Sequence, residues 1–292
     1  MRTLDVPHRT PTLSAYDSHL LGGAGLPLAE SARADRQTLV NGVFDHYEVS
    51  LACESRVLRH LMKMCLANRQ LLERQSVGFS NRTLGLRLPS VGTSERDQVR
   101  GALENLDLLI ASGGEFFRGA LVFPLKNDQG DVVEAYGQRL TPRLRQGTPY
   151  QAYWSLKSGR FFNHDALSCA EEIVLCENPF QAFCLLCHGV SGAVAPVGRW
   201  GFNDGQLDAL ERARPNRVVL AWENSADAQR AARLVCQAIS AIDVPVWHYA
   251  LNEPSVSRMP PPPITAEVAN RILMEAVPIG PEASTVWGGL WQ

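Results

Sequence analysis

The sequence contains no apolar run of about 18 residues, which is the length that a membrane-spanning helix needs. Its first ten residues, MRTLDVPHRT, also lack the apolar segment of a secretory signal peptide. We therefore expect no membrane span and a cytoplasmic location. What the chain does have is 292 residues, 45% of them hydrophobic, which can bury a core in one or two domains.

Cysteine is scarce and unevenly placed. The seven cysteines stand at positions 53, 65, 169, 176, 184, 187 and 236. Most of them fall inside predicted helices or strands, so reduced, buried thiols are expected. The segment from Cys184 to His188 has the C-x-x-C-H spelling of a c-type haem attachment site, but its apolar helical neighbours favour core packing.

Two predicted strands that each end in glutamate give the clearest functional signal. They are EIVLCE, ending at Glu177, and RVVLAWE, ending at Glu223. Helical apolar spacing follows each strand, and VPVWHYAL then reads as a further strand, an alternation typical of a parallel sheet. Because the carboxyl ends of parallel strands meet at one edge, the two acids should share one crevice. Such a pair indicates a divalent-metal site or a general acid and base.

This pattern resembles the Toprim domain of bacterial-type primases, topoisomerases and some nucleases. In that domain one strand ends in a catalytic Glu, usually followed by Gly, and a later strand ends in Asp-x-Asp, which holds Mg²⁺. The corresponding segments here are Glu177-Asn178 and Glu223-Asn224-Ser225, with Asp227 shortly after. The resemblance implies that Glu177, Glu223 and Asp227 are catalytic.

The segments upstream select one family among these. Residues 119–140, GALVFPLKNDQGDVVEAYGQRL, predict two strands around an Asn-Asp-Gln-Gly turn, and look like the strand pair before Toprim in primases. Residues 45–80 are similar to the primase helical hairpin, and residues 251–256 stand where primases have an Asp-Pro-Asp segment. From about residue 40 to about residue 275 the chain therefore resembles the catalytic core of bacterial-type (DnaG-like) DNA primases.

The resemblance implies an α/β fold, with a Toprim-type parallel sheet flanked by helices and a mixed α+β primase-like subdomain before it. We expect a flexible arm at 1–38, the nucleic-acid-binding N-terminal subdomain at 39–165 and the Toprim domain at 166–256. A proline-rich linker, a C-terminal helix and a tail that contains tryptophan should occupy 257–292.

Two departures from the family concern metals. Ser225 and Ser255 stand at the second acidic positions of segments that begin with Glu223 and Glu253, and a hydroxyl is a poor ligand for Mg²⁺. The resemblance therefore implies weak or single-site binding of Mg²⁺ or Mn²⁺ by Glu177, Glu223, Asp227 and Glu253. No zinc is expected, because the first 52 residues contain no cysteine from which to build the family's zinc ribbon.

Positive charge gathers in one block of the sequence. Residues 56–160 hold 16 Lys and Arg against 9 Asp and Glu, although the whole chain has a net charge of −2. The strongest candidates for nucleic-acid or nucleotide binding are Arg139, Arg143, Arg145, Lys157 and Arg160. A single arginine of this kind is more often a solvated surface residue, whereas the cluster favours phosphate contacts.

Two functional classes follow. The first is a primase-like nucleotidyltransferase of DNA replication, which acts on single-stranded DNA with nucleoside triphosphates and a divalent metal, beside a replicative helicase or a separate zinc-bearing subunit. The alternative is a catalytically impaired Toprim-fold subunit that binds nucleic acid or assists replication assembly, for example in a mobile element or phage. A nuclease is less favoured, because Toprim nucleases lack the upstream segments.

Overall fold

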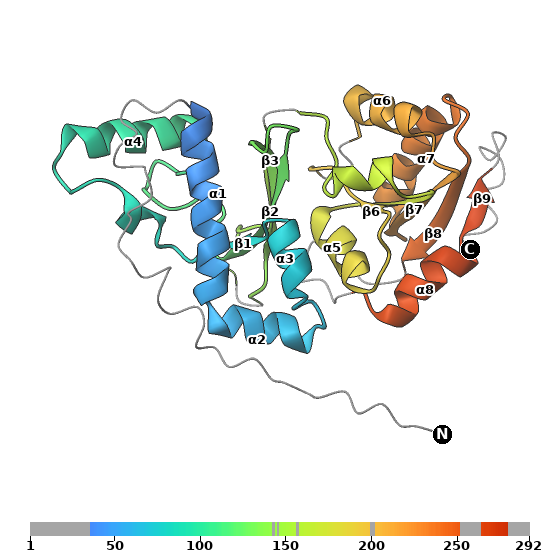
Figure 1. Ribbon diagram of the computed structural model, residues 1–292, viewed down its shortest axis with the longest axis horizontal. Coiled ribbons are helices and arrows are strands. Elements are labelled where there is room, and N and C mark those ends of the chain that lie inside the picture. The colour runs from blue at the N-terminus through green and yellow to red at the C-terminus, as the bar shows by residue number, and fades with distance from the viewer. Residues whose placement is uncertain are drawn as a thin grey trace, which may run out of the picture.

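The computed structural model describes residues 36–141, 144, 146–155, 158–198, 202–251 and 264–279, and these residues form two β-sheets with surrounding helices (Figure 1). The predicted N-terminal arm up to residue 35, most of the proline-rich segment and the tail lie outside the described residues. Within the described residues, none of the helices is both long and apolar enough to cross a membrane.

The first sheet is antiparallel, with the strand order β1-β2-β3-β4. Its strands are β1 (Gly78–Phe79), β2 (Ala120–Lys126), β3 (Val132–Arg139) and β4 (Gln151–Ser155). The N-terminal half of the protein, which contains this sheet, also has the helices α1 (Arg36–Cys53), α2 (Ser55–Lys63), α3 (Arg69–Arg74), η3 (Leu84–Arg87) and α4 (Ser94–Asn105). The predicted strand pair is confirmed as β2 and β3, whereas β1, β4 and α4 were not predicted.

The turn between β2 and β3 is built on Asn127. Its side-chain oxygen accepts hydrogen bonds from the backbone N–H groups of Gln129, at 3.0 Å, and Asp131, at 2.8 Å. Gly130 supplies the positive φ of 86° that the turn needs. An asparagine that binds the backbone two and four residues later favours such a turn locally, which is why the sequence alone could predict it.

Strand β2 is buried on both faces because the first sheet lies between α1 and the second half of the protein (Figure 1). Ala120 and Val122 belong to the core beneath α1, and Leu121, Phe123 and Leu125 belong to the core shared with the second sheet. This division follows from the alternation of side chains along a strand. One continuous apolar core therefore joins the two sheets.

The close fit of α1 on this sheet depends on Gly78. A Cβ atom at this position would lie 2.6 Å from the backbone carbon of Tyr47, so the helix could not approach a larger residue without moving. The residue belongs to the segment that resembled the primase helical hairpin and its glycine-containing turn. Its small size serves the packing of β1 against α1.

The second sheet has the strand order β6-β5-β7-β8-β9, and the first four of these strands are parallel. Its strands are β5 (Glu172–Cys176), β6 (Ala193–Val194), β7 (Arg217–Glu223), β8 (Val246–Leu251) and β9 (Val277–Ile279). Its helices are η4 (His164–Ser168), α5 (Pro179–Cys187), α6 (Asp204–Ala213), α7 (Ala226–Ser240) and α8 (Ala266–Glu275). The predicted parallel sheet is confirmed, but β9 pairs antiparallel with β8 at the edge and was not predicted.

The helices of the second half begin at side-chain caps. Asn178 caps α5, Asn203 caps α6 in a capping box with Gln206, Ser225 caps α7 and Thr265 caps α8. Each cap accepts a hydrogen bond from a backbone N–H that the first turn leaves without a partner.

The cysteines are only partly as expected. All seven are free, and Cys176, Cys184 and Cys236 are buried, with Cys187 partly buried. The remaining three, at positions 53, 65 and 169, are exposed, so the expectation of buried thiols was wrong for them. Each of the three lies at or beyond the end of a helix, where the helix no longer directs the side chain into the core. Cys184 packs in the core, as its apolar neighbours predicted.

Candidate active site

Glu177 follows β5 directly, and Glu223 ends the neighbouring strand β7. The Oε1 atom of Glu177 accepts a hydrogen bond from the backbone N–H of Glu223 at 3.0 Å. The Glu177 residue is 8% exposed, whereas Glu223 is half-buried. The prediction that these two residues lie together at the carboxyl ends of adjacent strands is therefore confirmed, and Glu177 links the two strand ends.

Gln181, in the first turn of α5, holds Glu177 in place. Its side-chain oxygen accepts the backbone N–H of Glu177 at 3.1 Å, and its nitrogen donates to Oε2 of Glu177 at 3.4 Å. Both residues are buried. Sequence analysis missed Gln181, although its spacing of four residues from Glu177 on a helical turn could have indicated the contact.

Ser225 and Asp227 both serve the start of α7. The Ser225 hydroxyl accepts the backbone N–H of Ala228 at 3.3 Å, which makes it the helix cap. Asp227 is exposed and forms an ion pair with Arg230 at 3.8 Å. An acidic residue in the first turn also stabilises a helix through its dipole. Ser225 and Asp227 thus both contribute to the local stability of the helix start.

A preformed metal cage is absent from the described part of the chain. No three side chains of His, Cys, Asp or Glu gather there in an arrangement that could hold an ion. Glu253 and Ser255 lie outside the described residues. The metal-ligand role of Glu177, Glu223, Asp227 and Glu253 therefore stays a prediction. Glu177 and Glu223 suit a single ion, because Mg²⁺ is commonly bound by one or two carboxylates, several waters and the substrate's phosphates.

A polar ladder on the first sheet lies next to this rim. Tyr136 pairs with Tyr153 across β3 and β4, and Gln138 pairs with Gln151. The Tyr136 hydroxyl donates to Gln138 at 2.5 Å, and that of Tyr153 donates to Gln151. Burial raises the pKa of Tyr136 well above its usual value, with smaller contributions from Tyr153 and Glu177.

Arg139 plays a structural role. Its guanidinium is largely buried and donates to the backbone carbonyls of Pro149 at 2.7 Å, Phe116 at 3.2 Å and Arg118 at 3.3 Å. Burial lowers the pKa of this arginine from its ordinary value. Three backbone carbonyls therefore occupy three of the five guanidinium N–H donors. This side chain joins the segment after α4 to the loop before β4, and its contact with phosphate stays a prediction.

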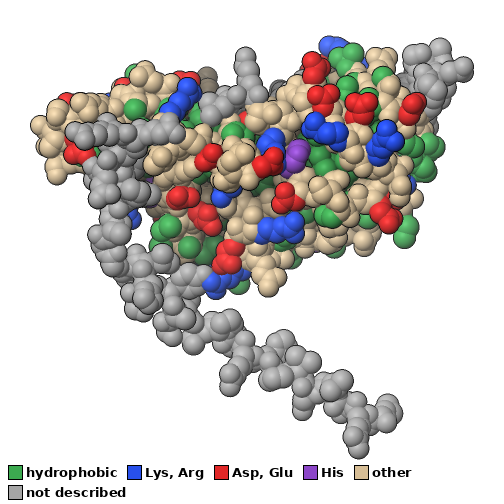
Figure 2. All heavy atoms as spheres, turned by 45° about the horizontal axis from the view of Figure 1, so that its top comes forward, with side chains coloured by type: hydrophobic (Ala, Val, Ile, Leu, Met, Phe, Trp, Pro, Cys, Tyr) green, Lys and Arg blue, Asp and Glu red, His purple; other side chains and the backbone are tan. Residues whose placement is uncertain are grey.

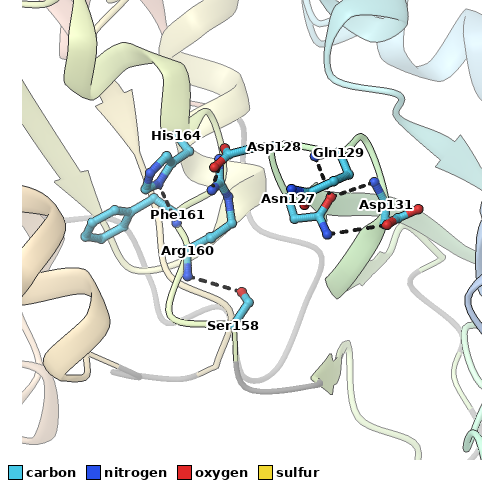
Figure 3. Close-up of polar contacts among 8 residues, drawn as sticks. All are labelled: Asn127, Asp128, Gln129, Asp131, Ser158, Arg160, Phe161 and His164. Carbon is cyan, nitrogen blue, oxygen red and sulfur yellow. Dashed lines mark hydrogen bonds and ion pairs between the residues drawn. The ribbon is translucent and has the colours of Figure 1, made fainter.

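Among the described members of the predicted basic cluster, Arg160 is the one that forms an ion pair. Its Nη1 lies 2.9 Å from Oδ1 of Asp128, in the turn between β2 and β3 (Figure 3). Arg143, Arg145 and Lys157 lie outside the described residues. On the face that Figure 2 shows, acidic and basic side chains are intermixed, so the charge surplus of residues 56–160 does not form one basic stripe there.

Comparison with known proteins identifies the fold. No family model matches the chain, and no curated protein sequence matches it. Among solved structures, the E. coli primase catalytic core is 17% identical with a TM-score of 0.66, and the match covers 88% of this chain and 84% of that one. The DnaG primase catalytic domain bound to single-stranded DNA is 18% identical with a TM-score of 0.65, covering 85% and 81%.

A longer Aquifex aeolicus primase structure, which contains zinc-binding and RNA polymerase domains, is 17% identical with a TM-score of 0.65. The match covers 90% of this chain but only 65% of that one. The chain therefore has the fold of the DnaG primase catalytic core, as the order of its sequence motifs predicted.

Proposed function

We propose that the chain is a primase-like protein of DNA replication that makes primers, or supports their synthesis, on single-stranded DNA. The observation that carries this proposal is the placement of Glu177, which is buried and fixed between the ends of β5 and β7 in the fold of a primase catalytic core. Two acidic residues at adjacent strand ends match the crevice in which open α/β sheets bind their ligands.

In this proposal, Glu177 and Glu223 hold one Mg²⁺ or Mn²⁺ ion. When bound, such an ion would neutralise negative charge on the phosphates of a nucleoside triphosphate. Gln181 keeps the Glu177 carboxylate in one orientation, and the N–H of Glu223 binds the other oxygen.

Single-stranded DNA is the proposed template. One solved structure of this fold is described as bound to single-stranded DNA, and two others as bound to double-stranded DNA, one of them with an overhang. Arg143, Arg145, Lys157 and Arg160 are the proposed phosphate contacts of this chain. A cytoplasmic location and association with a replicative helicase or a zinc-bearing subunit are part of the same proposal.

A primer-synthesis assay tests this function. Purified protein would be supplied with single-stranded DNA, labelled nucleoside triphosphates and either Mg²⁺ or Mn²⁺. Wild type should extend products that Glu177→Gln does not make, whereas Glu211→Gln, at an exposed acid on α6, should retain activity. Product formation by Glu177→Gln would show that the active site lies elsewhere. No product with either metal would leave nucleic-acid binding without synthesis as the remaining function.

A further inference from the structure

An ion pair connects the two halves of the protein at a place that nucleic acid is proposed to reach. Asp128 belongs to the turn between β2 and β3 of the first sheet, and Arg160 lies in the segment that leads from β4 into the second half (Figure 3). The two side chains differ in exposure, because Asp128 is 79% exposed and Arg160 is 18% exposed. The acid is thus the outer partner of the pair.

The backbones on both sides of this pair are held independently of it. The turn is fixed by Asn127, and Asp131 is bound by the side chain of Asn41 at 2.9 Å. On the other side, the backbone N–H of Arg160 donates to Ser158 at 3.2 Å, and its carbonyl accepts from Gln206 at 3.1 Å. The Asp128 side chain can therefore rotate away without the loss of either segment's own hydrogen bonds.

The pair leaves much of the binding capacity of Arg160 unused. A guanidinium carries five N–H donors in a planar fork that suits two oxygens of a carboxylate or phosphate. Here Nη1 contacts one Asp128 oxygen, while Nε is buried and has no hydrogen-bond partner. Ion pairs with a solvent-exposed partner are weak, since water competes for the charge. A stronger anion should therefore displace Asp128.

The imidazole of His164 lies in the same segment as Arg160 and is affected by both charges of the pair. Burial first, and then the charge of Arg160, lowers the pKa of His164, whereas Asp128 and Asp165 each raise it and Arg212 lowers it further. The Nδ1 atom of His164 accepts the backbone N–H of Phe161 at 3.4 Å, so the ring is oriented by the same segment (Figure 3).

We propose that Arg160 forms a phosphate-binding subsite that Asp128 fills in the free protein, and that a backbone phosphate of single-stranded DNA displaces this carboxylate. The inference rests on the proposed function, because it takes the ligand to be the template. Carboxylate and phosphate oxygens are both acceptors for a guanidinium, so the exchange conserves the hydrogen bond that Arg160 makes. Asp128 then lowers the affinity for DNA as an internal competitor.

The test is equilibrium binding of a fluorescein-labelled oligodeoxythymidylate to the full chain, measured by anisotropy at fixed salt. Asp128→Asn should tighten binding by about two- to fivefold, the range expected when a weak exposed ion pair is removed. The matched control is Asp165→Asn, which removes one negative charge from an exposed neighbour that does not pair with Arg160. Its effect measures the general gain from reduced repulsion.

Two further variants make the outcome specific. Arg160→Gln should weaken binding, and Asp128→Asn should give no additional gain in the Arg160→Gln background. Asp128→Glu, which can re-form the pair, should bind as wild type does. The inference is overturned if Asp128→Asn binds no more tightly than Asp165→Asn, or if its gain survives in the absence of Arg160. If wild type and all variants fail to bind the oligonucleotide, the proposed function fails as well.

Discussion

Gln181 and Glu177 bind each other twice, once through the backbone of the glutamate and once through its carboxylate. The arrangement gives the glutamine control over both the position and the orientation of the acid. Removal of the Gln181 amide would take away both of these hydrogen bonds in a buried, low-dielectric environment. The loss of hydrogen bonds to buried polar atoms lowers the stability of the folded state.

Replacement of Gln181 should damage metal use as well as stability. Gln181→Met keeps a similar shape but removes both hydrogen bonds, and we expect primer synthesis to fall about 10- to 100-fold, as for other residues that orient metal ligands. The metal concentration for half-maximal activity should rise as well. The control is Gln237→Met, on the exposed face of α7. A fall in activity with unchanged metal dependence would argue against a positioning role.

Ser225→Asp should strengthen metal binding without loss of the helix cap. Aspartate caps helices about as well as serine, so the start of α7 should be preserved while a carboxylate is added near Glu223. Ser225→Ala should instead cost about 1 kcal/mol of stability and add no ligand. Mn²⁺ should support wild type better than Mg²⁺, because it tolerates mixed oxygen ligands. Calorimetric metal titration of the three proteins, beside primer assays in each metal, measures these effects. Equal metal affinity in wild type and Ser225→Asp would remove this position from the site.

Arg139 should prove to be a stability residue. Arg139→Gln removes donors from three backbone carbonyls, and we expect a loss of about 3 kcal/mol in the free energy of unfolding. Arg118→Gln, at an exposed arginine whose carbonyl Arg139 binds, is the control and should be nearly neutral. Urea denaturation measures both. Equal stability of Arg139→Gln and wild type would contradict the structural role.

The salt dependence of DNA binding should report on the other members of the basic cluster. Joint replacement of Arg143 and Arg145 by Gln should flatten the plot of log affinity against log salt, by about 0.7 for each phosphate contact that is lost on a single strand. The measurement is anisotropy over a series of salt concentrations. An unchanged slope would exclude these two arginines from the interface.

Protein stability should fall as the pH falls from about 6.5 to 4, because two buried histidines resist protonation. Burial lowers the pKa of His248 to about 4, and burial followed by the charge of Arg87 lowers that of His46 to about 4. In this window the unfolded chain binds more protons than the folded one, so stability is present above it and lost within it. His248→Gln should reduce the pH dependence by up to about 3 kcal/mol. Urea denaturation at several pH values tests this, with His60→Gln, at an exposed position, as the control.

The predicted features are those that local chemistry specifies. Apolar periodicity marked β5, β7 and α7, because the spacing of apolar residues is a property of each segment alone. Strand β9 escaped prediction because three residues that include Pro278 carry almost no pattern. The carbonyl contacts of Arg139 and the ion pair of Arg160 escaped prediction because the acceptors, such as the carbonyl of Phe116 and the carboxylate of Asp128, are distant in sequence.

The aromatic ring of Phe123 has a consequence for how the molecule folds. It lies within about 6 Å, centre to centre, of the rings of Phe162, Phe180 and Phe183, so one strand of the first sheet completes the core of the second half. The two halves should therefore unfold in a single cooperative transition. Chain synthesis delivers the first sheet with this ring still uncovered. Until α5 has been synthesised, the nascent N-terminal half exposes an apolar surface around Phe123. We expect this surface to favour self-association unless a chaperone covers it or folding is completed rapidly.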